Sequence, residues 1–311
     1  MNKKPHFIIA GERRSGTTTL YDVLSKHPEI GMFEKTDFDY FIEPELFSLK
    51  PIIDENSISN WEQSHSKLEY NRLSERIKES ITGQKDADLL WWKQTHSRLA
   101  RYLPYCKFII ILRDPVKRAE SQYFNELKKG RETLSFKKAI EREFNGNLTS
   151  WEKLHLQYIK RGCYIESIEH FIKYIPKERV KIVILEELME NWSEEMESIC
   201  TFLGINNSEE IFHNPIQSNK EELLEKKSYA KYPLIKYLFN FWDRLSEAII
   251  VRVANNKFKR DKIRKQLRGF YYTSKRKKQV LNIEIEKYLK NYYKPFNQKL
   301  EEFLGDKITK W

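Results

Sequence analysis

Apolar runs alternate with amphipathic segments along the first two thirds of the chain. Three runs are predicted strands: 7–10, 107–112 and 180–185. The run 107–112 has no polar alternation, as a strand buried on both faces would have none. Five segments are predicted helices: 17–26, 71–80, 116–129, 164–174 and 194–203. Strands that alternate with helices predict an α/β fold, with a mostly parallel sheet flanked by helices.

The domain organisation is predicted to be simple. The 311 residues include only 10 Gly and 10 Pro, and we find no internal repeat and no low-complexity linker. We therefore expect a single domain over 1–311, with a helical, basic insertion or extension over 215–285. A 40% hydrophobic composition is enough for a sizeable core and excludes global disorder.

Charge is distributed unevenly. Residues 1–219 hold 32 basic and 34 acidic residues, whereas residues 220–311 hold 24 basic and 11 acidic ones. Such an excess attracts anionic sugars, lipid head groups or nucleic acid. The alternative is a solvated helix face. The aromatic and aliphatic stretch 229–253 has two possible positions, on a membrane surface or, as we favour, packed against the main body.

Cysteine use and hydropathy bear on the compartment. The three cysteines are far apart in sequence and none forms a metal-type pair, which favours a reducing compartment over a disulfide scaffold. No apolar run approaches the roughly 20 residues that span a bilayer, and the first run is too short for an export signal. We expect a cytoplasmic protein, with the inner face of the membrane as an open alternative.

A glycine loop joins the first apolar run to the first predicted helix. Residues 11–18 read Gly-Glu-Arg-Arg-Ser-Gly-Thr-Thr, and glycines before a helix N-terminus are typical of a phosphate-binding loop. The spacing is that of a nucleotide-triphosphatase loop, but Thr17 stands where that motif has lysine. We therefore expect Arg14 and the hydroxyls of Thr17 and Thr18 to hold a phosphate ester without Mg²⁺.

A second basic motif follows the central apolar run. Residues 113–123 read Arg-Asp-Pro-Val-Lys-Arg-Ala-Glu-Ser-Gln-Tyr, and Arg113 comes at the carboxyl end of the predicted strand, where open α/β sheets bind ligands. If a helix begins near Pro115, Ser121 lies about 9 Å along it. Arg113 and Ser121 then form a second anion pocket; an ion-paired turn is the plain alternative.

Together the two motifs resemble those of sulfotransferases that use 3′-phosphoadenosine 5′-phosphosulfate (PAPS), most closely the carbohydrate, heparan-sulfate-like and bacterial branch. That family has G-x-x-[KR]-[ST]-G-[ST]-T for the 5′-phosphosulfate and R-[DN]-P-x-x-R-x-x-S-x-Y for the 3′-phosphate. Weaker matches occur at 104–107, 161–164, 202–204 and 293–311. The resemblance implies a P-loop-type sheet and these donor contacts: Arg13, Arg14, Ser15, Gly16, Thr17, Thr18, Arg113 and Ser121.

The resemblance also implies catalytic roles. Arg14 corresponds to the residue that stabilises charge on the leaving 5′-phosphate, and Lys85, in Gly-Gln-Lys-Asp, to a lysine near the reacting groups. The family's base is a glutamate in K-E-x-x-F-F, and the corresponding stretch here reverses the order of the lysine and the glutamate. Glu34 is the favoured base, with Asp37 and Asp39 as alternatives. No metal is implied, and no His, Asp or Glu cluster has metal-ligand spacing.

The predicted activity is transfer of a sulfuryl group from PAPS to a carbohydrate hydroxyl, by in-line displacement with a carboxylate base. The predicted partner is a sugar or polysaccharide acceptor, with a lipid-linked acceptor and a peripheral membrane contact left open. Two alternatives remain: a P-loop small-molecule kinase, and a binding module for anionic surfaces or nucleic acid. Nucleic acid is not the expected partner, because no RNA-binding signature is present.

Overall fold

The structure is a computed structural model that forms two compact units. One unit comprises Met1–Ser218 with Leu281–Trp311, and the other comprises Asn219–Val280. The residues described are 4–33, 79–129, 131–146, 148–207, 223–226, 272–275, 283–305, 308 and 310–311.

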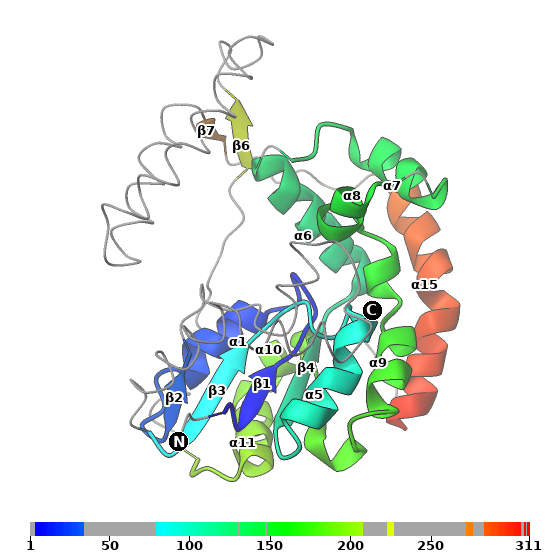
Figure 1. The fold of residues 1–311 in the computed structure, drawn as a ribbon. Helices are drawn as coiled ribbons and strands as arrows, with labels where there is room; N and C mark the ends of the chain where they lie inside the picture. Colours follow the sequence, from blue (N-terminus) through cyan, green and yellow to red (C-terminus); the bar gives the residue numbers. More distant parts are fainter. Residues whose placement is uncertain are drawn as a thin grey trace. The chain divides into compact units, whose positions relative to one another are not determined.

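A five-stranded sheet forms the centre of the larger unit, in the order β2-β3-β1-β4-β5 (Figure 1). Every neighbouring pair is parallel, so all five strands end at the same edge. The strands are β1 (Phe7–Ile9), β2 (Ile30–Met32), β3 (Ile81–Lys85), β4 (Lys107–Leu112) and β5 (Val180–Ile184). β1 lies between β3 and β4, which brings the ends of these three strands together.

Helices cover both faces of the sheet (Figure 1). On one face Ile8, Phe108 and Ile110 pack against α5 (His96–Tyr102), α9 (Tyr164–Ile172) and α15 (Ile283–Leu304). On the other face Ile9 and Ile109 pack against α1 (Thr17–Leu24) and α11 (Trp192–Leu203). Successive strand residues therefore supply two separate cores, as the alternation of side chains along a strand requires.

A third apolar cluster joins α6 (Pro115–Lys128) to α7 (Phe136–Phe144) and α15. Short helices complete the unit: α8 (Ser150–His155), α10 (Leu185–Glu190), η1 (Lys93–Thr95), η2 (Lys160–Gly162) and η3 (Lys177–Arg179). Gly162 at the end of η2 permits this packing, because a Cβ there would lie 2.8 Å from the Tyr293 ring and 2.9 Å from Pro115.

The predicted α/β class is confirmed, and the predicted strand 107–112 has the bounds of β4. The predicted helices 17–26, 116–129, 164–174 and 194–203 correspond to α1, α6, α9 and α11, and the predicted helix 71–80 lies almost entirely outside the described residues. β2 and β3 are additional strands that the apolar pattern did not predict.

The smaller unit contains an antiparallel pair, β6 (Leu223–Lys226) with β7 (Tyr272–Lys275). The segment 215–285 was expected to be helical. Apart from this pair and the start of α15, it lies outside the described residues, so the helical expectation stays a prediction. Within the described part of the chain, no helix combines the length and the apolarity needed to cross a membrane.

Candidate active site

The predicted phosphate loop lies at the carboxyl end of β1 and leads into α1. Gly16 is the N-cap residue of α1 and has a φ of 95°, a left-handed conformation that favours glycine. No described side chain caps the helix, and its first turn contains no acidic residue. The N–H groups of this turn, with the positive end of the helix dipole, are therefore suited to bind an anion.

Arg14 joins the phosphate loop to the second motif. Its Nε donates a hydrogen bond to Ser121 Oγ at 3.0 Å, and its carbonyl oxygen accepts one from Arg113 Nη1 at 3.2 Å. Arg14 has a φ of 67°, which is costly for a residue with a side chain and needs support from its surroundings. The two motifs, about 100 residues apart in sequence, thus form one site.

The second motif is shaped by Asp114 and Tyr164. The carboxylate of Asp114 accepts hydrogen bonds from the N–H groups of Val116 and Lys117 and so caps α6, while Pro115 occupies its first turn. The Tyr164 hydroxyl donates to the Arg113 carbonyl oxygen at 2.7 Å. Asp114 therefore sets the start of the helix that carries Ser121, and Tyr164 holds the backbone of Arg113.

Lys85 reaches the same edge of the sheet from the end of β3. Its Nζ lies 3.4 Å from Thr18 Oγ1, in the first turn of α1. Among the other loop residues, Ser15 and Thr17 are buried and Thr18 is partly exposed. The structure therefore brings a lysine beside a loop hydroxyl.

Arg13 has a different set of contacts from Arg14. Its guanidinium forms an ion pair with Asp88, with Nε 2.6 Å from Oδ2. Burial raises the pKa of Asp88, but Arg13 and Arg161 outweigh burial, so the pKa of this carboxyl lies below its ordinary value. The contact with Asp88 ties Arg13 to the segment that follows β3, and the sequence pattern gave no sign of it.

Two further buried arginines were not assigned a role from the sequence. Arg118 lies within the second motif, and its guanidinium donates to Gln122 Oε1 at 2.7 Å and to the Tyr158 carbonyl oxygen. Arg161 binds the carboxylates of Glu12 and Asp88. A fully buried arginine needs such partners, so both residues hold the elements around the site together.

The three candidate bases, Glu34, Asp37 and Asp39, lie outside the described residues. The last described residue before them is Phe33, whose N–H donates to the Gly83 carbonyl oxygen at 2.8 Å. Its own carbonyl oxygen accepts from the Tyr21 hydroxyl at 2.7 Å. Gly83 and Lys85 are both on β3, so the segment that contains the candidates continues from a point beside this strand.

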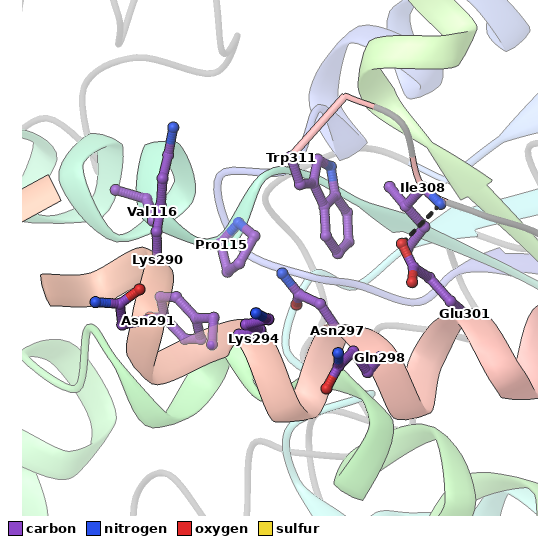
Figure 2. A pocket seen from close by; sticks show the side chains of 11 residues that line it. Pro115, Val116, Lys290, Asn291, Lys294, Asn297, Gln298, Glu301, Ile308 and Trp311 are labelled. Carbon is purple, nitrogen blue, oxygen red and sulfur yellow. Dashed lines mark hydrogen bonds between the residues drawn. The ribbon is translucent and has the colours of Figure 1, made fainter. Parts of the chain in front are cut away.

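A cavity of about 350 Å³ lies beside the start of α6, and Figure 2 shows the side chains around it. α15 supplies Lys290, Lys294 and Asn297, and the last residue, Trp311, closes one side. Trp311 Nε1 donates to Glu186 at 3.1 Å. None of the predicted donor-binding residues lines this cavity. In the described part of the chain, no group of three or more His, Cys, Asp or Glu residues is arranged to hold a metal ion.

Comparisons with known proteins bear on the family to which the chain belongs. Residues 5–209 match the sulfotransferase family. The mouse heparan sulfate glucosamine 3-O-sulfotransferase 3B1 is 25% identical over 205 residues, covering 65% of this chain and 46% of the relative. Human carbohydrate sulfotransferase 15 is 21% identical over 363 residues, covering 99% of this chain and 54% of the relative. The chain thus spans about half the length of the curated relatives it matches.

Among solved structures, a sulfotransferase from Alicyclobacillus acidocaldarius matches with a TM-score of 0.56 and 24% identity, covering 78% of this chain and 92% of that one. At this identity the match supports the fold. The match over 5–209 includes both phosphate motifs and the residues that join them. The chain therefore belongs to the sulfotransferase family.

Proposed function

We propose that this chain transfers a sulfuryl group from PAPS to a hydroxyl of a carbohydrate acceptor. The observation that carries this proposal is the junction of Arg14, Ser121 and Arg113. A donor with phosphates at its 3′ and 5′ positions needs two adjacent anion sites, and this junction supplies two arginines from different motifs. Such a pair of motifs is expected in a member of the sulfotransferase family.

The described residues are chemically suited to this donor. The uncapped N-terminus of α1 and the guanidinium of Arg14 provide N–H donors and positive charge for the 5′ end. Arg113 and the Ser121 hydroxyl provide the same for the 3′-phosphate. Thr17 stands where the loop of a nucleotide triphosphatase has its lysine, so these residues favour PAPS over a nucleoside triphosphate.

Sulfuryl transfer requires positioning, charge stabilisation and removal of one proton. We assign charge stabilisation at the leaving 5′-phosphate to Arg14, because a guanidinium combines positive charge with several N–H donors that match a phosphate. We assign to Lys85 a contact with the transferred group, and its position beside Thr18 supports this role. Glu34, with Asp37 and Asp39 as alternatives, accepts the acceptor's hydroxyl proton while the new oxygen–sulfur bond forms.

The carbohydrate acceptor is proposed from the relatives, whose names specify heparan sulfate and carbohydrate. The 24 basic residues of the last third suit an acidic saccharide. The relatives support neither a lipid-linked acceptor nor a membrane contact. Cys106, Cys163 and Cys200 are all free and buried, which favours a reducing compartment such as the cytoplasm.

A transfer assay tests the proposal against the kinase alternative. Purified protein is incubated with PAPS and a panel of neutral and acidic saccharides, and both sulfated product and adenosine 3′,5′-bisphosphate are measured. We expect both products in equal amounts, without added Mg²⁺, and loss of both in Arg14→Ala. Turnover of ATP with Mg²⁺, in a protein inactive with PAPS, would support the kinase instead.

A further inference from the structure

A network of four charged side chains, of which three are buried, joins the phosphate loop to the rest of the larger unit. At its centre is Arg161, from η2, whose side chain is 0% exposed. Arg161 Nε lies 2.9 Å from Glu12 Oε1, and Nη2 lies 2.6 Å from the same oxygen. Nη2 is also 2.5 Å from Asp88 Oδ1. One guanidinium thus joins the loop to the segment that follows β3.

The other oxygen of Asp88 binds Arg13, the loop residue next to Glu12. Glu12 Oε1 also accepts a hydrogen bond from the Arg13 backbone N–H at 2.8 Å. Glu12 is therefore held by Arg161 and Arg13 by Asp88, and these two partners are paired with each other. Glu12 and Arg13 directly precede Arg14, the residue that contacts Ser121.

This position matters because Arg14 has a left-handed backbone conformation. Such a conformation persists in a residue with a side chain only where the surrounding structure enforces it. Neighbours that were free to move would let the loop relax, and the Arg14 guanidinium would lose its place beside Ser121. Removing Arg161 also takes the ion pair from the buried carboxylate of Glu12, which is a costly change in a protein interior.

We propose that Arg161 is a positioning residue: through Glu12 and Asp88 it fixes the phosphate loop and thereby sets the affinity for the 5′-phosphate of the donor. This inference rests on the proposed function. No described contact joins Arg161 to Arg14, Ser121 or Arg113, so its effect on binding is indirect. A residue of purely structural importance would change stability without discriminating between the two ends of the nucleotide.

The test compares two nucleotides. Affinity for adenosine 3′,5′-bisphosphate is measured by calorimetry, and affinity for adenosine 3′-monophosphate by ligand-observed NMR, which reaches millimolar dissociation constants. In Arg161→Met we expect bisphosphate affinity to fall about ten-fold or more, with 3′-monophosphate affinity unchanged. Arg142→Met is the matched control, because Arg142 lies on α7 and is paired with buried Glu132. This variant should lower the melting temperature without changing either affinity.

Asp88→Asn and Arg161→Lys provide the same test if Arg161→Met does not fold. Asp88→Asn weakens the contacts of residue 88 with Arg13 and with Arg161. Arg161→Lys keeps the positive charge but loses the guanidinium that bridges the two carboxylates. Folded variants that bind the bisphosphate as tightly as wild type would overturn this inference but not the proposed function. Equal losses of affinity for both nucleotides would have the same consequence. A folded wild-type protein that binds neither nucleotide would overturn the proposed function, and this inference with it.

Discussion

Replacing Ser121 by alanine removes the hydroxyl that joins the two phosphate motifs. In the structure this hydroxyl accepts a hydrogen bond from Arg14 Nε at 3.0 Å, and we assign it a second contact, to the 3′-phosphate. A hydrogen bond to a charged group contributes about 1.5–3 kcal/mol. Because Arg14 is partly exposed, the lower figure applies to each contact. The Arg14 contact is present with and without the donor, so it cancels in the binding free energy. The 3′-phosphate contact alone predicts a loss of about 1.5 kcal/mol, or about 12-fold in donor affinity.

Calorimetry with adenosine 3′,5′-bisphosphate measures this loss, and a thermal melt run in parallel reports stability. The matched control is Ser198→Ala, because Ser198 on α11 accepts a hydrogen bond from Lys181 at an exposed position. We expect the control to bind like wild type. A folded Ser121→Ala protein whose affinity stays within about threefold of wild type would refute the assignment of Ser121 to the donor site.

Gly162→Ala should lower the melting temperature by several degrees, because overpacking against Tyr293 and Pro115 costs about 1–3 kcal/mol; an unchanged melt would contradict this packing. Burial lowers the pKa of His96 in the folded protein to about 4. As the pH drops below about 6.5, the unfolded chain therefore binds a proton that the folded protein does not bind, and stability falls. His96→Gln should show a smaller fall in melting temperature between about pH 7.5 and pH 5 than wild type, and an equal fall would count against the shift. The candidate bases are Glu34, Asp37 and Asp39. The alanine variant that loses transfer rate but retains donor affinity should identify the base, and full activity in all three variants would exclude this segment from the chemistry.

The central strands and the main helices were predictable because burial leaves a local signature. Residues 108–112 are apolar throughout, since β4 is an inner strand with helices on both sides, and the sequence shows this without further context. β3 has no such signature, although it lies between β2 and β1. Its sequence is Ile-Thr-Gly-Gln-Lys, and Gly83 occupies a position where the side chains of Phe7 and Met32 leave no room for a Cβ.

The meeting of Arg14 with Arg113 followed from general topology. Arg113 comes directly after β4 and Arg14 lies in the loop that follows β1, and parallel strands end at one edge of the sheet. The partners of the neighbouring charges did not follow from any pattern. Arg161 is 149 residues from Glu12 and 73 residues from Asp88, and nothing in the local sequence of any of them indicates an ion pair. Only the fold decides which buried charges become neighbours.

The most direct test of the account is the binding of adenosine 3′,5′-bisphosphate to the wild-type protein, to Arg14→Ala and to Arg113→Ala. One nucleotide held at both ends by adjacent anion sites should bind with a dissociation constant of about 1 μM, or about −8 kcal/mol. We predict that Arg113→Ala loses most of this affinity and that Arg14→Ala binds more weakly than wild type. The absence of measurable binding to the folded wild-type protein would contradict the account.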